Sequence, residues 1–382
     1  MMKLKKFLKL TILIPFLLIQ FSPVSAASIN SNNSTNTLLT IDQPPAQTLN
    51  GEFYDDHLAD ELLPSGSLGE LVFGKVPNGT TWKINPETFN EIFSMSNGYK
   101  LTGGRNGAGQ ELAAQWLKKL KEVVKPDSVF ALPYGNPSGY WVNRLLTHDS
   151  NFVLNAGSQT LSKFFGFPVL PANSFSSKNY FPLNKRGLTT FTYFNQTIKN
   201  FALYLTNDQL TGLELYSNTL LRNDLTQLQI TNISADISNY ADQLQNEIYL
   251  SPAKFTVTSS NQKLPITLVN TFQRNAKVKL FLIPVNRKIS TPSLLEVNIA
   301  ARSKIQTLIP VHSLTSGISG IQISAIGNNG QFLSRPVAYP VNVKILNPIV
   351  TWITTLAAIT LFVAVLIRNL RKFLNRKQKI NG

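Results

Sequence analysis

The sequence predicts an α/β domain, built as a partial barrel or a mainly parallel sheet, followed by an all-β immunoglobulin-like sandwich and one transmembrane helix. Three observations support this fold class. Between residues 49 and 232, strand-like apolar runs alternate with amphipathic helical runs, as in parallel α/β sheets. Between residues 251 and 346 the apolar residues recur with period two, which is typical of half-buried strands. Residues 349–367 are apolar and carry no charge, which favours a membrane span.

Residues 1–26 have the pattern of a secretory signal peptide. A lysine-rich start precedes a long apolar run, and small residues follow at Val24-Ser25-Ala26. The alternative is an uncleaved membrane anchor. Residues 27–48 are rich in Ser, Asn, Thr and Pro, which predicts a flexible leader with a short strand at 38–41.

The region from 49 to 232 shows local signals for each expected element. Pro86 is placed to open a helix, and Leu112, Trp116 and Leu120 recur at helical spacing. We expect helices at 55–63, 86–95, 109–124, 138–148 and 158–166. We expect strands at 80–84, 128–133, 151–155, 167–172 and 189–194.

A connecting helix is expected at residues 233–250, before the sandwich. Within residues 251–346, short runs of alternating apolar residues predict strands, and the Gly327–Gly330 sequence GNNG predicts a hairpin turn. The predicted strands lie at 253–258, 264–271, 276–285, 294–299, 304–311, 318–326 and 332–345. This number of short strands in so few residues is the pattern of an immunoglobulin-like sandwich.

The C-terminal apolar run is long enough to cross a bilayer, since 19 residues of helix span roughly 28 Å. Trp352 lies near one end, as interfacial aromatic residues do, and a basic tail follows at residues 368–382. The positive-inside rule then places the tail in the cytoplasm and the N-terminal part outside, in a single-pass protein of the cell membrane. The alternative is a buried helix of a globular domain.

The net charge of +16 does not predict nucleic-acid binding. Ten of the 36 basic residues lie in the signal peptide and the tail, and neither segment contains an acidic residue. The expected outer part therefore has a mild net charge of +6, so only weak attraction to anionic envelope polymers is expected. The absence of cysteine excludes thiolate chemistry and disulfides.

No catalytic or metal-binding residues emerge from the sequence, and no cofactor is expected. A zinc deacetylase needs two histidines a helical turn apart beside an aspartate, whereas the three histidines, His57, His148 and His312, form no such pair. Asp55 and Asp56, which precede His57, are expected to begin a helix. A glycosidase needs two nearby carboxylates. Candidates near strand ends are Glu87, Asp127 and Asp149, but their spacing fixes no pair.

The loop ALPYGNPSGYW, residues 131–141, ends a predicted central strand at the edge where α/β proteins bind ligands. Its aromatic side chains could stack on the apolar faces of sugar rings, or they could instead cover the open end of the sheet as core. The candidate ligand-binding residues are Tyr134, Asn136, Tyr140, Trp141 and Trp82.

The stretch from DELLPSGSLGELV through TTWKINPETFNEIFSMSNGYKL to GAGQELAAQWLKKLKEVVKPDSVFALPYGNPS resembles the DUF6049 family. The sandwich sequence LPITLVNTFQRNAKVKLFL is also similar to the domain that precedes the terminal span in that family. The resemblance covers roughly residues 55–368. It implies an uncharacterised, exported and membrane-anchored envelope protein, mostly of actinobacterial type, whose α/β part is distantly similar to a polysaccharide deacetylase or glycosidase barrel.

The resemblance also implies a link to cell-wall work, because members often lie beside genes for a peptidoglycan-precursor flippase. This chain has Asn136 and Ser138 where the family usually has acidic residues, and it is shorter. The favoured hypothesis is a non-catalytic binding or scaffold module, with wall glycan or a membrane protein of peptidoglycan-precursor export as partner. The alternative is a wall-polysaccharide hydrolase or deacetylase-like enzyme that uses carboxylates at the C-terminal edge of the α/β sheet.

Overall fold

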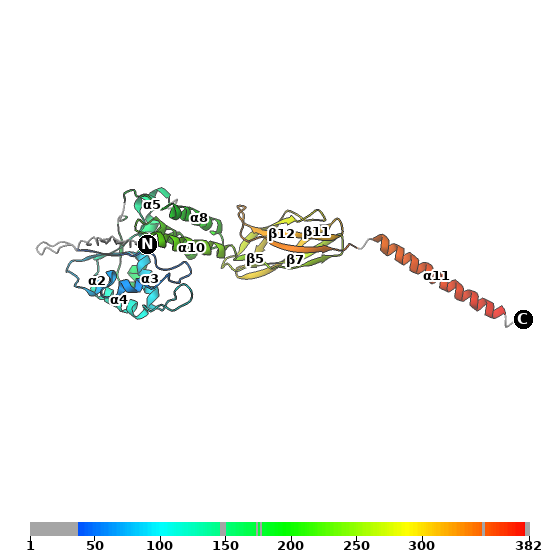
Figure 1. Cartoon of the computed structure of the whole chain (residues 1–382), viewed down its shortest axis with the longest axis horizontal. Coiled ribbons are helices and arrows are strands. Elements are labelled where there is room, and N and C mark those ends of the chain that lie inside the picture. Colours follow the sequence, from blue (N-terminus) through cyan, green and yellow to red (C-terminus); the bar gives the residue numbers. More distant parts are fainter. Residues whose placement is uncertain (1–36, 146–149, 173–174, 176–177, 346–347, 379–382) are drawn as a thin grey trace, which may run out of the picture. The chain divides into compact units, whose positions relative to one another are not determined.

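The computed structural model describes residues 37–145, 150–172, 175, 178–345 and 348–378. The predicted signal peptide and most of the predicted leader lie outside these residues. The described elements run from a small parallel sheet with its helices, through a group of helices, to two further sheets and one long helix (Figure 1). A mixed α/β part is therefore followed by a β-rich part and a C-terminal apolar helix, in the predicted order.

The first sheet has four parallel strands in the order β1-β2-β3-β4. Their bounds are β1 Leu38–Ile41, β2 Thr81–Ile84, β3 Val129–Ala131 and β4 Leu170–Pro171. The helices that share its core are α1 His57–Leu62, α2 Ser67–Phe73, α3 Pro86–Ser96, α4 Gln110–Val123 and α7 Ser158–Phe165. Trp82 on β2 and Trp116 on α4 lie fully inside this core. All four strands end at the same edge because they are parallel.

A second group of helices follows in the chain. It contains α5 Gly139–Leu145, α6 Ser150–Asn155, α8 Lys185–Phe201, α9 Asn207–Ser217, the 3₁₀ turn η1 Asn218–Leu221 and α10 Gln227–Leu244. Capping boxes begin α9 at Thr206 and α10 at Thr226, because in each the residue three positions later is a glutamine. The predicted connecting helix at 233–250 is displaced, since α10 starts and ends earlier and β5 Ile248–Leu250 follows.

Two predicted strands are wrong, because residues 151–155 form α6 and residues 189–194 lie within α8. The threonines and phenylalanines of 189–194 favour strands locally. Phe191, Phe194, Ile198 and Phe201, however, recur at helical spacing and are all buried. A buried stripe on one helical face outweighs local β propensity.

The β-rich part of the described chain contains two sheets that share one core, and their strands pair antiparallel except for β6, which pairs with β13 in parallel. Their orders are β10-β8-β12-β13-β6 and β5-β7-β11-β9. The remaining bounds are β6 Phe255–Val257, β7 Asn261–Asn270, β8 Ala276–Pro284, β9 Ile289–Ser290, β10 Leu294–Ile299, β11 Ser303–Ser313, β12 Gly317–Ile326 and β13 Val337–Val343. Each predicted strand of this region is confirmed, and Gly327 and Gly330 form the predicted turn.

The last element is α11, Pro348–Gln378. Its apolar window Trp352–Arg371 is long enough to span a membrane and is not buried by any other part of the described chain. Because unpartnered apolar helices of this length are unfavourable in water, the window indicates membrane association.

Candidate functional site

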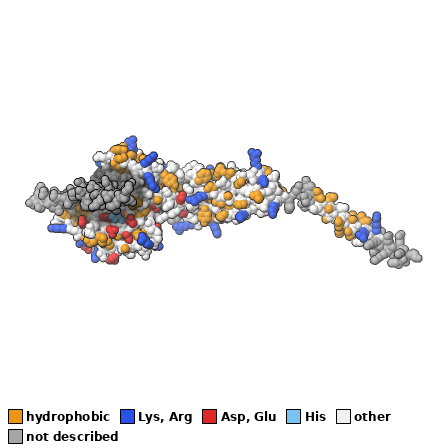
Figure 2. Space-filling view, viewed as in Figure 1, with side chains coloured by type: hydrophobic (Ala, Val, Ile, Leu, Met, Phe, Trp, Pro, Cys, Tyr) orange, Lys and Arg blue, Asp and Glu red, His pale blue; other side chains and the backbone are white. Residues whose placement is uncertain are grey.

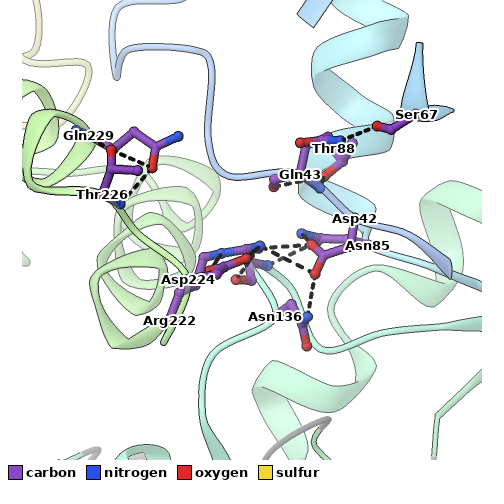
Figure 3. A network of polar contacts seen from close by, with 11 residues as sticks. Asp42, Gln43, Ser67, Asn85, Thr88, Asn136, Arg222, Asp224, Thr226 and Gln229 are labelled. Atoms are coloured by element: carbon purple, nitrogen blue, oxygen red, sulfur yellow. Dashed lines mark hydrogen bonds and ion pairs between the residues drawn. The ribbon is translucent and has the colours of Figure 1, made fainter. Parts of the chain in front are cut away.

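The C-terminal edge of the parallel sheet carries a polar residue after three adjacent strands. Asp42 follows β1 directly, and Asn85 follows β2. Asn136 lies in the loop after β3, where it adopts a left-handed conformation with φ of 45°. Figure 3 shows that the three side chains converge. Asn85 donates to Asp42 Oδ1 at 2.8 Å, and the Asn136 amide donates to Asp42 Oδ2.

The side-chain oxygen of Asn85 fixes two backbone segments at this edge. This Oδ1 atom accepts from the backbone N–H of Glu87 at 3.0 Å, which caps α3, and from that of Gly135 at 3.1 Å. Gly135 has a φ of 73°, and a Cβ there would lie 3.0 Å from the Thr219 side chain. Only glycine therefore lets the β3 loop approach both Asn85 and η1.

Arg222, from the segment after η1, closes the edge (Figure 3). Its guanidinium contacts Asp42 through both terminal nitrogens, at 2.8 and 3.3 Å. It also contacts Asp224 through Nε and Nη2, at 2.8 and 2.6 Å, and donates to the Gly135 carbonyl at 3.1 Å. The Arg222 side chain is 1% exposed, whereas that of Asp224 is 48% exposed. Burial lowers the pKa of Arg222, but the hydrogen bonds and charges of Asp224 and Asp42 outweigh it and raise the net pKa.

Two buried glutamates lie beneath this edge, one helical turn apart on α3. Glu91 Oε1 accepts from the backbone N–H groups of Ala46 and Gln47, at 2.8 and 2.9 Å. Among the described residues, the Oε2 atoms of Glu87 and Glu91 have no hydrogen-bond partner. Burial raises the pKa of Glu91 to about 7, against the effect of these hydrogen bonds and of Arg222. Burial and the charge of Glu91 raise the pKa of Glu87 well above its usual value.

A hollow of about 280 Å³ lies between the segment after β1 and the start of α10. Its walls come from the segment after β1, from α1 and from the start of α10, and they carry both polar and apolar groups. The polar lining residues include Gln43, Tyr54, Asp55, His57, Glu61, Thr226, Gln229 and Asn232. The hollow can admit a small polar ligand. Asp42 itself is not among its lining residues.

A separate aromatic surface lies on α5 and the segment before α8. Tyr140, Trp141 and Tyr180 form it, with ring centroids 5.1 to 5.8 Å apart. Arg144 lies 5.9 Å from the Tyr140 ring, and Trp141 Nε1–H donates to the Phe181 carbonyl at 2.9 Å. Tyr180 is 61% exposed. Phenol and indole rings held edge to face in this way leave apolar ring surface and polar groups side by side.

The structure thus separates the five residues predicted from sequence. Tyr140 and Trp141 belong to the aromatic surface. Asn136 belongs to the C-terminal edge of the parallel sheet, which we call the strand edge and which is formed by Asp42, Asn85, Asn136 and Arg222. Tyr134 lies half-buried against α3, where burial and the charges of Glu87 and Glu91 raise the pKa of its hydroxyl. Trp82 is 1% exposed in the core of the parallel sheet, so its ring offers no face to a ligand.

The histidines and aspartates considered for metal binding or catalysis do not come together in one site. His57 is exposed and lies 3.4 Å from Glu61, and His312 contacts Asn261 in the sandwich. Asp56, which precedes α1, accepts hydrogen bonds from Tyr99 and from the backbone of Ala108. His148 and Asp149 lie outside the described residues. Within the part of the chain that the structure describes, no group of three His, Cys, Asp or Glu side chains could hold a metal.

Sequence reasoning missed Asp42, Glu91, Arg222 and Asp224. One signal was available for the first of these, because Asp42 follows an apolar strand in the sequence LLTID, as Asn85 does in TWKIN. Polar residues that directly follow parallel strands meet at one edge. Arg222 gives no such signal, since it lies 180 positions from Asp42 in the sequence.

Solved structures similar to this chain match about a quarter of its length. An α2-macroglobulin fragment from Escherichia coli is 16% identical over 25% of this chain and 16% of its own, with a TM-score of 0.20. The CARDB domain of a Pyrococcus furiosus protein, determined with di-metal ions, is 11% identical over 26% of this chain and 92% of its own, with a TM-score of 0.21. A PapD-like domain of human CEP192 is 9% identical over 26% and 87%, with a TM-score of 0.20.

Because each TM-score is far below 0.5, the fold is described from the strand orders given above. A comparison with curated proteins found no match. The sequence profile of DUF6049, a family of unknown function, matches residues 189–375, which run from within α8 through both sheets of the β-rich part into α11. The stretch of residues 55–138 that also resembles the family in the sequence analysis lies before the matched segment. Over residues 189–375, this chain is thus similar to the DUF6049 family.

Proposed function

We propose that the protein is a single-pass, outward-facing cell-envelope module that binds glycan of the cell wall and has no catalytic role. The observation that carries this proposal is the aromatic surface of Tyr140, Trp141 and Tyr180, beside the cation of Arg144. Sugar rings present apolar C–H faces that stack on such rings, while their hydroxyl groups can hydrogen-bond to phenol groups. The window Trp352–Arg371 would anchor the module in the cell membrane.

The strand edge supports a binding role rather than a catalytic one. A carboxylate that acts as base or nucleophile must reach its substrate. Asp42 is instead held by Asn85, Asn136 and Arg222 together. On this proposal the α/β domain, residues 49–232, keeps the layout of a polysaccharide-modifying barrel without its chemistry. The immunoglobulin-like sandwich, residues 251–346, would act as a spacer or as a docking surface for a membrane protein of peptidoglycan-precursor export.

The experiment is co-sedimentation of the full chain, kept in detergent, with purified cell-wall sacculi at low and moderate salt. Stacking predicts binding that resists moderate salt and decreases strongly in Tyr180→Ala, whose ring is exposed. Tyr193→Ala is the matched control, because Tyr193 is 45% exposed on α8 and outside the aromatic surface. Trp141→Ala should act like Tyr180→Ala. Binding that modest salt abolishes, or that all variants retain, would overturn the glycan proposal.

The second candidate is a wall-polysaccharide hydrolase or deacetylase-like enzyme. One observation favours it, namely the pair of buried glutamates with raised pKa values beneath the strand edge. A glutamate that holds a proton near neutral pH can act as a general acid. Release of sugar or acetate from the same sacculi, lost in Glu87→Gln, would establish this candidate in place of the first.

A further inference from the structure

The charge of the protein is divided unevenly between its parts. Residues 251–345 contain eleven basic residues and one acidic residue, Glu296, whereas residues 37–250 contain 15 basic and 19 acidic residues. The sandwich therefore carries a net charge of +10, although the expectation from the whole outer part was a mild and even excess. A domain with a large net positive charge attracts anionic surfaces.

One end of the sandwich joins α11. Val343, the last residue of β13, pairs with Gly317 at the start of β12 and with Val257 at the end of β6. The loops at this end are tied together by hydrogen bonds. Leu314 N–H donates to the Lys288 carbonyl at 2.8 Å, and the Asn286 amide donates to the Ile318 carbonyl at 3.1 Å. These loops therefore present their side chains from a fixed frame.

Exposed apolar side chains and basic side chains lie together at this end. Val285, Leu314 and Ile318 are 67%, 54% and 77% exposed, although each is aliphatic. Three basic residues of the same loops accompany them. We call this set the rim, and its residues are Val285, Arg287, Lys288, Leu314, Ile318 and Lys344. Apolar and basic side chains are visible together over the sandwich in Figure 2. The combination is the one that amphipathic segments use at lipid surfaces.

The length of the connection limits how far the rim can lie from the membrane. Val343 ends β13 and Pro348 begins α11, so four residues lie between them and five residue-to-residue steps join their Cα atoms. A fully extended chain of five residues spans about 17 Å. The rim therefore stays close to the start of the helix, whatever angle the sandwich adopts.

We propose that the rim docks on the anionic headgroup region of the leaflet from which the sandwich emerges. Val285, Leu314 and Ile318 insert among the headgroups, and the three cations contact lipid phosphates. This inference rests on the membrane anchoring in the proposed function, but not on glycan binding. Docking would hold the sandwich at a fixed height and tilt, so that the domains beyond it point away from the membrane.

The test uses the full chain in vesicles of phosphatidylcholine and anionic phosphatidylglycerol that contain a nitroxide-labelled headgroup lipid. Since the protein has no cysteine, Ile318→Cys and Phe332→Cys each give one site for a fluorophore. Phe332 is the matched control, because it is 58% exposed and follows the turn after β12, at the opposite end of the sandwich. We expect quenching of the Ile318→Cys label to be several-fold stronger than that of the Phe332→Cys label.

A charge variant tests the role of the cations. In the Ile318→Cys chain, the triple change Arg287→Gln, Lys288→Gln and Lys344→Gln should weaken quenching. The triple change Lys254→Gln, Lys277→Gln and Lys304→Gln, which removes the same charge elsewhere, should leave it unchanged. Equal quenching at both label sites would overturn the proposal, and binding to wall polymer in place of vesicles would assign the cations to that partner. Failure of the chain to float with carbonate-washed vesicles would instead reject the anchoring.

Discussion

Arg222 is the residue that joins the end of β1 to the second group of helices. It is buried, it contacts two carboxylates, and its removal would leave Asp42 without a counter-charge. Breaking a buried ion pair by deleting one partner is much more costly than breaking an exposed pair, because the remaining charge is desolvated. The buried contacts of Arg222 therefore contribute more to stability than the exposed ion pairs of the chain do.

We expect Arg222→Ala to lower the free energy of unfolding by about 3–5 kcal/mol. Urea denaturation of the chain in detergent, followed by the fluorescence of the buried Trp82 and Trp116, measures this change. Arg335→Ala is the control, because both partners of the Arg335–Asp242 pair are at least 60% exposed, and it should change stability by less than about 1 kcal/mol. Equal effects of the two changes would contradict the role assigned to Arg222.

The buried Glu91 predicts a pH dependence of stability. Its pKa is about 7 in the folded protein and 4.5 in the reference state, so the folded protein binds the proton more tightly between these values. Stability therefore decreases as the pH rises from about 4.5 to 7, and Glu87 acts in the same direction. The loss attributable to Glu91 is on the order of 3 kcal/mol.

We expect Glu91→Gln to flatten this pH dependence, because the amide oxygen can still accept from Ala46 and Gln47 but cannot ionise. Urea midpoints measured from pH 5 to pH 8 check the prediction. Glu122→Gln, a change of the same type at an exposed position on α4, should leave the slope as it is in the unchanged chain. A slope unaffected by Glu91→Gln would show that other groups cause it.

The strands of the sandwich illustrate how elements avoid unwanted pairing. Ser251 N–H donates to the Thr267 carbonyl, so odd-numbered residues of β7 face β5 and even-numbered residues face β11. The backbone nitrogen of Pro265 therefore faces the outer edge of β7, beyond the residues that pair with β5. The β7–β11 register likewise turns the backbone nitrogen of Pro310 toward the outer edge of β11, next to the two residues that pair with β9. Proline lacks the N–H that would recruit another strand, so both free edges of this sheet are protected.

We expect Pro310→Val to increase self-association of the chain, because it restores an edge N–H and adds a β-branched side chain. Gln306→Val is the matched control. It adds the same side chain at another edge-facing position of β11 that already has an N–H. Sedimentation in detergent at increasing protein concentration measures the effect. Association that is as strong in Gln306→Val would assign it to apolar surface and not to the edge N–H.

At the scale of the whole molecule, two cores divide the described chain. One core lies between the parallel sheet and its helices, and the other contains the second group of helices and the sandwich. The contact between Asp42 and Arg222 crosses from one to the other. Asp236 on α10 accepts from the Leu49 backbone at 2.9 Å, and Leu49 packs against the core of the second group of helices. The DUF6049 match begins inside the second group of helices.

The sequence by itself determined the features that depend on local patterns. Period-two runs located the strands of the sandwich, Pro86 marked the start of α3, and a charge-free run located the apolar helix. These features are readable because each is encoded within one segment. The strand predicted at residues 189–194 failed because short apolar runs suit both strands and helices until their partners are known.

Only the tertiary structure decided which residues meet at the strand edge and which of them are buried. It joined Asp42 to Arg222 across 180 positions, buried Glu87 and Glu91, moved Trp82 into the core and placed Tyr180 beside Trp141. It also gathered the rim from three separate loops. The physical reason is that burial, charge pairing and pKa depend on neighbours brought together by the fold, and separation along the chain does not encode them.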